Sequence, residues 1–301
     1  MKNQIRSENT SKEVLLKNIK RKIPILNREP QLFQGIPIPS WIELSLIDVC
    51  NRTCSFCPKS DSQIAPDTFQ KMELVLIDKL ISDLRKIDFQ GSFCLCGYGE
   101  PLLHKELIKI INKLGSLGGV EVITNGDAIN EKTLINLYES SASQVLISMY
   151  DGPEQRIKFQ NLRKKLNIPE KFVILRDRWH GADDNFGLGD VSNRGGTLGS
   201  PMDEISKKKF NKKKCYYTAY QTIVDWDGSM YVCPNDWNRK MSMGNIMQKD
   251  FFDVWNGSII SSYRKELLNG ERKKSPCNVC NVDGTVYGEK HSNAWLEAFK
   301  K

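Results

Sequence analysis

Three cysteines stand together in one short segment of the chain. Cys50, Cys54 and Cys57 are spaced C-x3-C-x2-C, and no other Cys or His lies within thirty residues of them. Spacings of four and three residues place three thiolates around one small volume. A closed structural zinc site takes four protein ligands. An iron–sulfur cluster held by three cysteines instead leaves one iron open to a group that is not protein. A zinc knuckle or a set of buried thiols is the alternative.

A second set of cysteines lies near the C-terminal end. Cys215 and Cys233 are separated by seventeen residues, and Cys277 and Cys280 form a C-x2-C pair. Four thiolates complete one iron–sulfur cluster or one zinc site, and the ligand count fits either. The total of nine cysteines is odd, and no secretion signal precedes them, which argues against a disulfide framework. The remaining pair, Cys94 and Cys96, alternates in an apolar stretch, and we expect small core side chains there.

The composition is that of a globular protein. The 301 residues are 40% hydrophobic and 27% charged, which excludes a collagen-like or wholly disordered chain and indicates about two domains. No apolar run approaches the roughly 18 residues that a membrane span needs, and we expect a cytoplasmic protein with no membrane partner. The net charge of +8 permits an anionic ligand but is too diffuse to indicate nucleic acid binding.

Apolar runs that alternate with helical periodicity predict the elements that position these cysteines. We expect strands at residues 42–47, 92–96, 120–124, 144–149 and 172–176. Helical spacing predicts helices at residues 77–87 and 107–114. Strand starts 24 to 28 residues apart indicate repeated βα units and hence a parallel sheet or barrel, with separate hairpins as the alternative. Polar residues follow each strand, at the edge where such folds bind ligands.

The remaining segments are less regular. Residues 1–40 are polar, Lys-rich and contain four prolines, and we expect one basic helix near residues 11–22 and then an extended lead-in. Residues 177–203 are glycine-rich, which indicates a long functional loop or a domain junction. The lysines of residues 207–214 indicate a solvated face, with phosphate binding as the alternative. A β-hairpin over residues 222–232 and a helix near residues 250–268 are expected after it.

The first cysteine motif, with Phe56 just before its third cysteine, resembles the radical S-adenosylmethionine enzymes. The resemblance implies a partial (β/α)6 barrel in which S-adenosyl-L-methionine chelates the open iron of a 4Fe-4S cluster held by Cys50, Cys54 and Cys57. One-electron reduction then cleaves the sulfonium to a 5′-deoxyadenosyl radical. The segment Gly97-Tyr98-Gly99-Glu100-Pro101 resembles the family's GGEP segment, with Gly-Tyr-Gly where many members have Gly-Gly. The residues implied to contact S-adenosylmethionine are Phe56, Gly97, Gly99, Glu100, Asn125, Ser148 and Arg176.

The C-terminal region resembles the SPASM region of the same family. The resemblance rests on Gly244-Asn245-Ile246, on Val254-Trp255 and on Pro276-Cys277-Asn-Val-Cys280. Four cysteines match the shorter twitch variant, so the resemblance implies one auxiliary 4Fe-4S cluster held by Cys215, Cys233, Cys277 and Cys280. A cluster with four protein ligands is closed to substrate and suits electron transfer. We therefore expect an N-terminal extension at residues 1–40, a radical SAM core at 41–203 and a SPASM/twitch domain, built of a β-hairpin plus a helix, at 204–301.

The favoured hypothesis is oxidation of a secondary alcohol on a sugar, cyclitol or nucleotide-linked precursor, because the spacing of the second cysteine set is similar to that of an alcohol-oxidising family member. Arg194 is the first candidate for the proton acceptor or alcohol-orienting cation. His180, Asp183 and Asp184 are the next candidates. Small-molecule substrate and a flavodoxin or ferredoxin type electron donor are the expected partners. The alternatives are a peptide maturase, a redox-neutral epimerase that uses a spare cysteine, and a zinc-stabilised interaction protein.

Overall fold

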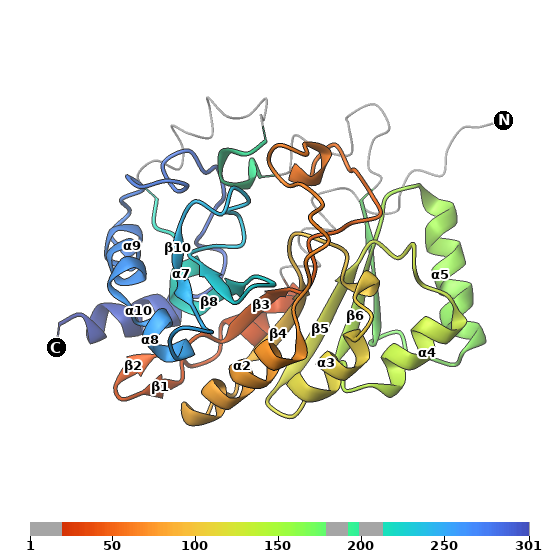
Figure 1. The fold of residues 1–301 in the computed structure, drawn as a ribbon, viewed down its shortest axis with the longest axis horizontal. Coiled ribbons are helices and arrows are strands. Elements are labelled where there is room, and N and C mark those ends of the chain that lie inside the picture. The colour runs from red at the N-terminus through yellow and green to blue at the C-terminus, as the bar shows by residue number, and fades with distance from the viewer. Residues whose placement is uncertain (1–19, 179–191, 199–212, 301) are drawn as a thin grey trace.

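A single eight-stranded sheet runs through the protein (Figure 1). The computed structural model describes residues 20–178, 192–198 and 213–300. The strand order is β10-β9-β8-β3-β4-β5-β6-β7, and β1 and β2 form a separate antiparallel pair. The strands are β1 Leu32–Phe33, β2 Ile36–Pro37, β3 Trp41–Ser45, β4 Ser92–Cys96, β5 Gly119–Thr124, β6 Gln144–Met149, β7 Val173–Asp177, β8 Gln221–Val224, β9 Ser229–Tyr231 and β10 Ser242–Asn245.

The five strands from β3 to β7 are parallel neighbours in chain order. The prediction of repeated βα units is therefore confirmed, and the hairpin alternative is wrong for this part of the chain. The strands expected at 92–96 and 144–149 have the predicted bounds, and the other three differ by one or two residues. The sheet ends at β10 on one side and at β7 on the other, so it is open and the α/β architecture is a partial barrel.

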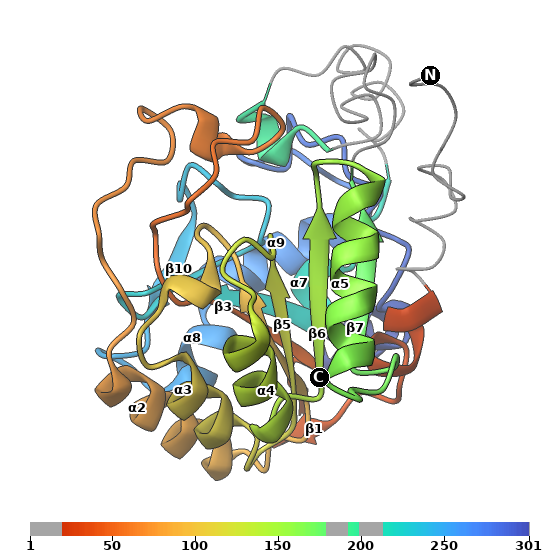
Figure 2. The same cartoon turned by 90° about the vertical axis from the view of Figure 1, so that its right-hand side faces the viewer.

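Helices cover the outer side of the sheet (Figures 1 and 2). In α2 and α3 the buried apolar residues recur every three or four positions, so these helices bury one face each in the core. Helix α8, from the C-terminal part of the chain, packs against α2 and extends this layer. None of the helices in the described ranges has the length and apolar character of a membrane span. The helices are α2 Leu74–Lys86, α3 Leu107–Leu114, α4 Glu131–Glu139, α5 Pro153–Lys165, α7 Tyr217–Tyr220, α8 Phe251–Trp255, α9 Ser258–Leu268 and α10 Glu289–Ala298.

The C-terminal hairpin of β8 and β9 is part of the same sheet. The hairpin itself was expected, but β8 also pairs in parallel with β3, from Trp41 opposite Gln221 to Leu44 opposite Val224. All four residues of β8 are buried, as in a strand covered on both faces. The single helix expected near residues 250–268 is two helices, because the chain leaves the helical conformation at Gly257, which has φ −64° and ψ 164°.

The N-terminal extension docks onto the core. Residues 20–26 are helical: residues 20–22 agree with the end of the expected helix, whereas the expected extended lead-in is wrong for residues 23–26. Residues 11–19 of the expected helix lie outside the described residues. Arg21 forms a salt bridge with Glu121 of β5, and Leu26 is buried. Lys22 lies 4.7 Å from the ring centroid of Trp41 on β3. Most of the glycine-rich loop and of the lysine run, the boundary at 203/204, and His180, Asp183 and Asp184 also lie outside the described residues.

A buried arginine joins the C-terminal helices. Arg264 of α9 has no exposed surface, and its guanidinium carbon lies 3.9 Å from the ring centroids of both Trp255 and Trp295. It donates to the carbonyl oxygens of Thr218 and Trp255, each at 2.7 Å. Burial lowers its pKa well below the usual value. Two carbonyl oxygens and two aromatic faces therefore stabilise the guanidinium of Arg264. These groups lose their partner if Arg264 is replaced.

We expect Arg264→Met to lower the free energy of unfolding by about 3 kcal/mol, because two buried carbonyls lose their donor. Urea denaturation of the anaerobically purified protein measures this. The exposed Arg85 on α2 provides the control, since Arg85→Met should change the free energy by less than about 0.5 kcal/mol. Equal stability of the two variants would contradict the role given to Arg264.

Candidate functional site

The carboxyl ends of β3 to β7 lie along one edge of the sheet. The register places Ser45 at the end of β3 opposite Cys96 at the end of β4, and Ser148 near the end of β6 opposite Arg176 of β7. The segment with the first cysteines follows β3, and the Gly-Tyr-Gly-Glu segment follows β4. The residues implied to contact S-adenosylmethionine lie up to 120 positions apart in the chain, from Phe56 to Arg176, and are thus on neighbouring strand ends or in the loops that follow them.

The three cysteines of the first set lie in one compact loop. The N–H of Cys57 donates to the carbonyl oxygen of Cys54 at 2.9 Å, which closes a tight turn between them. Burial, followed by the charges of Cys57 and Cys50, raises the pKa of the Cys54 thiol to about 11. The three thiols therefore lie close enough to repel one another once ionised. Such a site favours a bound cation or cluster that replaces the protons.

Arg52 ties this loop to the ends of β5 and β6. Its guanidinium donates to both carboxylate oxygens of Asp127 at 2.6 Å and to those of Asp151 at 2.8 and 2.5 Å. Both carboxylates raise the pKa of Arg52. Asn125, at the end of β5, donates to Asn51 at 2.8 Å and lies 3.9 Å from the sulfur of Cys50. The loop is therefore fixed against two other strands, a role for Arg52 that the sequence analysis missed.

The two glycines of the Gly-Tyr-Gly-Glu segment are required by the protein itself. Gly97 has φ +97°, and a Cβ there would lie 2.7 Å from the Cβ of Ser45. A Cβ on Gly99 would lie 2.1 Å from the carbonyl oxygen of Ile47 and 2.7 Å from that of Val49. Glycine at both positions lets the segment after β4 pack directly on the backbone that leads into the cysteine loop. Tyr98 between them is buried, and its hydroxyl donates to the carbonyl of Asp236.

Glu100 is a buried link between β4 and β5. It is 3% exposed and accepts hydrogen bonds from the hydroxyl of Thr124 at 2.6 Å and from the N–H groups of Asn125 at 2.9 Å and Leu102 at 3.0 Å. Burial raises its pKa, and these three donors oppose that rise. Glu100 therefore holds the ends of β4 and β5 together. Its expected contact with the ammonium group of S-adenosylmethionine stays a prediction.

The other predicted contact residues lie on the next two strands. The ring of Phe56 lies against that of Tyr150, with centroids 5.3 Å apart. Arg176 of β7 donates to the hydroxyl of Ser148 on β6 at 2.6 Å. Phe56, Asn125, Ser148 and Arg176 are thus brought to the same edge as Cys50, Cys54 and Cys57.

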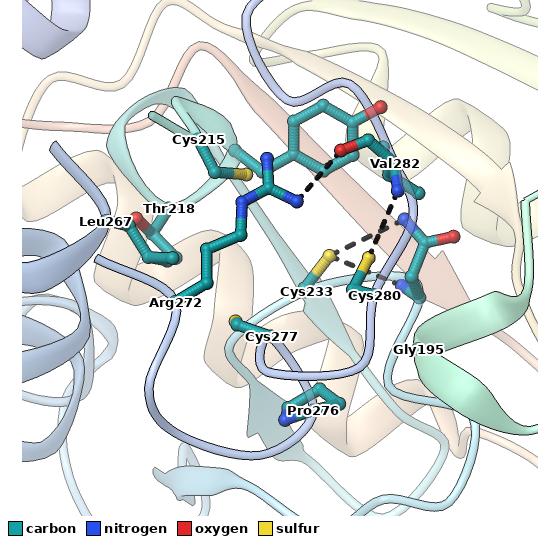
Figure 3. A pocket seen from close by; sticks show the side chains of 12 residues that line it. Gly195, Cys215, Thr218, Cys233, Leu267, Arg272, Pro276, Cys277, Cys280 and Val282 are labelled. Atoms are coloured by element: carbon teal, nitrogen blue, oxygen red, sulfur yellow. Dashed lines mark hydrogen bonds between the residues drawn. The ribbon is translucent and has the colours of Figure 1, made fainter. Parts of the chain in front are cut away.

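The four cysteines of the second set line one pocket (Figure 3). Cys215 precedes α7, Cys233 follows β9, and Cys277 and Cys280 come from the loop after α9, so three separate segments converge. The sulfur of Cys233 accepts from the N–H of Asn235 at 3.4 Å, and that of Cys280 accepts from the N–H of Val282 at 3.5 Å. Burial raises the pKa of the Cys215 thiol to about 11, and Arg272 opposes that rise.

Arg272 is the second residue that the sequence analysis missed. It is buried, and its guanidinium donates to the carbonyl oxygens of Lys213, Lys214 and Val282. It therefore joins the segment before Cys215 to the segment after Cys280. Its positive charge favours ionised Cys215, Cys277 and Cys280. No sequence signal marked it, because a single arginine in a basic chain carries no pattern.

The short segment 192–198 lies between the two cysteine sets. Asn193 is held by Asn281 at 2.8 Å and by the carbonyl oxygen of Val279 at 2.7 Å. Gly195 has φ +64° and lines the second cysteine pocket, where a Cβ would lie 2.5 Å from the carbonyl oxygen of Asn235. The charge of Arg194 acts on the first cysteine set. It lowers the pKa of Cys57, although burial raises that pKa by more. Segment 192–198 thus lines the pocket of the second set and carries a charge that acts on the first; the candidate role of Arg194 stays a prediction.

Cys94 and Cys96 lie inside the partial barrel rather than in an all-apolar core. Their sulfur atoms and the carboxylate of Glu43 on β3 lie within 4.8 Å of one another. Cys94 is fully buried, while Cys96 is half-buried at the end of β4. Lys22, Cys96 and Arg194 offset the rise that burial causes in the pKa of Glu43. The expectation that both cysteines are ordinary core residues therefore holds for Cys94 and is incomplete for Cys96.

Both cysteine sets fit iron–sulfur clusters by their donor chemistry. All nine cysteines lie in the described residues, and none forms a disulfide. The first set offers three sulfurs in one loop, and the second offers four sulfurs around one pocket with N–H groups directed at two of them. Hydrogen bonds to cluster sulfurs are a common means of stabilising the reduced state. The three-ligand set leaves a coordination position for a molecule that is not protein.

Comparison with known families agrees with this donor chemistry. Residues 44–173 match the model of the radical SAM superfamily, and residues 215–281 match the SPASM model, an iron-sulfur cluster-binding domain. The two matches contain the first and second cysteine sets respectively.

Individual relatives give the same result. The chain is 32% identical to the S-adenosyl-L-methionine-dependent 2-deoxy-scyllo-inosamine dehydrogenase of Niallia circulans, over 80% of this chain and 92% of that one. It is 28% identical to the GTP 3′,8-cyclase of Aquifex aeolicus over 70% of this chain and 64% of the relative. The crystal structure of BtrN in complex with AdoMet and 2-DOIA is similar, with a TM-score of 0.70 and 30% identity over 85% of this chain and 98% of that one. The chain therefore belongs to the radical SAM superfamily and carries a SPASM iron–sulfur domain, and these domains imply 4Fe-4S clusters and S-adenosyl-L-methionine as its cofactors.

Proposed function

We propose that this protein oxidises a secondary alcohol of a small molecule by hydrogen-atom abstraction. The observation that carries the proposal is the placement of Arg194 and Gly195 between two cysteine sets of different ligand number. A site with an open iron on one side and a closed cluster on the other suits a two-electron oxidation, because the first electron leaves with a hydrogen atom and the second has an acceptor nearby.

Each set of residues has a separate task. Cys50, Cys54 and Cys57 hold the cluster that binds S-adenosyl-L-methionine, and Cys215, Cys233, Cys277 and Cys280 hold the auxiliary cluster. Gly97, Gly99, Glu100, Asn125, Ser148 and Arg176 form the edge on which S-adenosyl-L-methionine lies, with Phe56 beside it. When bound, these groups supply a 5′-deoxyadenosyl radical and an acceptor for the second electron.

The chain's own residues position the substrate. Arg194 is the cation that orients the alcohol oxygen, since its guanidinium carries five N–H donors and lies between the two cysteine sets. A guanidinium also lowers the pKa of a neighbouring hydroxyl, so it favours loss of the alcohol proton as the carbon is oxidised. The buried Tyr98 and the packed Gly97 and Gly99 close the strand edge beneath the site.

The substrate class follows from relatives. The Niallia circulans relative is named for a cyclitol alcohol, 2-deoxy-scyllo-inosamine, and BtrN was crystallised with a small molecule. We therefore place the substrate among sugars, cyclitols and nucleotide-linked precursors. The peptide-bound structure of Streptococcus suis SuiB is only 14% identical and shares the fold alone, so the peptide maturase alternative gains no support from it.

Redox-neutral epimerisation is the second candidate, because the half-buried Cys96 lies at the end of β4 directly before Gly97. A thiol at this position could return a hydrogen atom to a substrate radical. The same proposal includes an electron donor of flavodoxin or ferredoxin type, a cytoplasmic location and no nucleic acid or membrane partner. It also includes domain boundaries at residues 40/41 and 203/204.

Iron content separates the two cysteine sets. After anaerobic reconstitution we expect about eight irons per chain, about four when Cys50, Cys54 and Cys57 are replaced by Ala, and about four when Cys277 and Cys280 are replaced by Ala. Cys94→Ala is the control, since this thiol belongs to neither set and the variant should keep about eight. Unchanged iron in either multiple variant would refute that ligand assignment.

Isotope transfer tests the reaction. Alcohols deuterated at the carbinol carbon, drawn from cyclitols, sugars and sugar nucleotides, are incubated with reduced enzyme and S-adenosyl-L-methionine. We expect deuterium in 5′-deoxyadenosine and a ketone product, both measured by mass spectrometry. Labelled 5′-deoxyadenosine with an inverted alcohol that contains solvent hydrogen would instead favour epimerisation. Unlabelled 5′-deoxyadenosine throughout would contradict abstraction from the alcohol carbon.

The orienting role of Arg194 predicts a particular pattern of kinetics. Arg194→Gln should lower kcat about a hundredfold, because the alcohol proton loses its adjacent cation, and Arg194→Lys should restore part of the loss. Iron content and binding of S-adenosyl-L-methionine should not change. A kcat for Arg194→Gln within twofold of the original enzyme would show that this residue does not act on the alcohol.

A further inference from the structure

Three arginines gather at the β7 side of the site. Arg176 lies on β7 and Arg178 directly after it, so the two side chains leave the same face of the strand. Arg194 comes from segment 192–198. The charge of Arg194 lowers the pKa of both Arg176 and Arg178, and Arg176 is the largest cause that lowers the pKa of Arg178 to about 9. The three guanidiniums therefore form one cationic cluster, named here the arginine cluster.

No carboxylate in the described part of the chain forms a salt bridge with the arginine cluster, although the charge of Arg194 acts on Glu43. Arg176 donates to the hydroxyl of Ser148, and its Nε atom is buried without a partner. The Nε atom of Arg194 is also buried without a partner. The side chain of Arg178 forms no hydrogen bond or salt bridge with any described residue. The preceding residue, Asp177 at the end of β7, is paired with Arg156. Three neighbouring cations that form no salt bridge are unfavourable unless an anion binds among them.

Several other partly buried cations among the described residues are paired with carboxylates. Arg21 pairs with Glu121, Arg156 with Asp177 at 2.7 Å, and Arg239 with Asp225 at 2.5 Å. Two of these pairs, Arg21–Glu121 and Arg156–Asp177, have their carboxylate on a strand of the parallel sheet. The buried Arg264 donates to two carbonyl oxygens instead, whereas the side chain of Arg178 has neither kind of partner among the described residues.

The number of charges indicates the chemistry of this anion. The carboxylate of S-adenosyl-L-methionine carries one negative charge, which balances one cation, and Arg176 is the residue assigned to that edge above. Among the described residues, Arg178 then still lacks a counter-charge, and the neighbouring Arg194 has a buried Nε donor without a partner. A phosphoryl group carries close to two negative charges at neutral pH and offers three acceptor oxygens, and guanidinium forks match this geometry well.

We propose that Arg178 and Arg194 bind a phosphoryl group of the substrate, so that the oxidised alcohol belongs to a sugar phosphate or a nucleotide-linked sugar rather than to an uncharged cyclitol. This inference rests on the proposed function and selects among the substrates named there. Arg194 has enough donors to contact both the phosphoryl group and the alcohol oxygen. Arg178 acts on the phosphoryl group alone, which makes it the informative residue to change.

The test is anaerobic calorimetry with the reconstituted enzyme and saturating S-adenosyl-L-methionine, without reductant, so that no turnover occurs. The probes are UDP-glucose, glucose 1-phosphate, inorganic phosphate and glucose. We expect the two phosphorylated sugars to bind, inorganic phosphate to bind more weakly than either, and glucose to show no binding. Glucose that binds as tightly as glucose 1-phosphate would overturn the proposal, and so would phosphate that binds more tightly than both sugar ligands, because the site would then hold a free anion.

Variants identify the residue responsible. Arg178→Gln should weaken binding of glucose 1-phosphate at least tenfold, and Arg178→Lys should weaken it less, because it keeps the charge. Arg85→Gln on the exposed face of α2 is the matched control and should bind like the original enzyme. Iron content of about eight confirms that each variant is folded and loaded. Unchanged affinity in Arg178→Gln would overturn the proposal, as would a selective loss of S-adenosyl-L-methionine binding, which would assign Arg178 to that cofactor.

The experiments distinguish failure of the phosphoryl-binding proposal from failure of the proposed oxidation. An enzyme that oxidises an uncharged alcohol and does not bind glucose 1-phosphate would retain the reaction and lose this substrate class. An enzyme that binds sugar phosphates through Arg178 but forms no labelled 5′-deoxyadenosine would keep the binding site and lose the proposed oxidation.

Discussion

The parallel register of β3 to β7 is the constraint on which the rest of the site depends. It sets the ends of five strands along one edge, so that the loop with Cys50, Cys54 and Cys57 meets Glu100, Asn125, Ser148 and Arg176. Close packing then fixes the details, because Gly97 and Gly99 lie against the backbone of β3 and of the loop that follows it. Arg52 completes the arrangement by joining that loop to the ends of β5 and β6.

The pairing of β8 with β3 places the two cysteine sets in one rigid frame. Cys215 precedes β8 and Cys233 follows β9, while Cys50 follows β3, so one ladder of hydrogen bonds connects both sets. Segment 192–198 then spans the gap, held on one side by Asn281 and lining the second pocket through Gly195. A fixed separation between an open cluster and a closed one is what an electron needs in order to pass from the substrate to the second cluster. The extension of residues 20–26 packs on the sheet through the salt bridge of Arg21 with Glu121 and through the buried Leu26.

The elements of this fold were predictable from the sequence where a local pattern determines them. Two strands had the expected bounds, and both cysteine sets were recognisable, because alternation and ligand spacing are short-range properties. The joining of β8 to β3 was not predictable, since the sequence of a short buried strand does not specify its partner. Arg52, Arg178 and Arg272 were missed for a similar reason: each acts through residues that are distant in the chain. Glycines 97 and 99 were correctly selected as part of a motif, while their packing against β3 became visible only in three dimensions.

The central claim is that three cysteines leave one iron open to S-adenosyl-L-methionine. Electron paramagnetic resonance of the dithionite-reduced Cys277→Ala/Cys280→Ala variant tests it directly, because only the first cluster then contributes a signal. The account predicts a signal from a reduced 4Fe-4S cluster whose g values shift when S-adenosyl-L-methionine is added. A spectrum that does not change on this addition would contradict it.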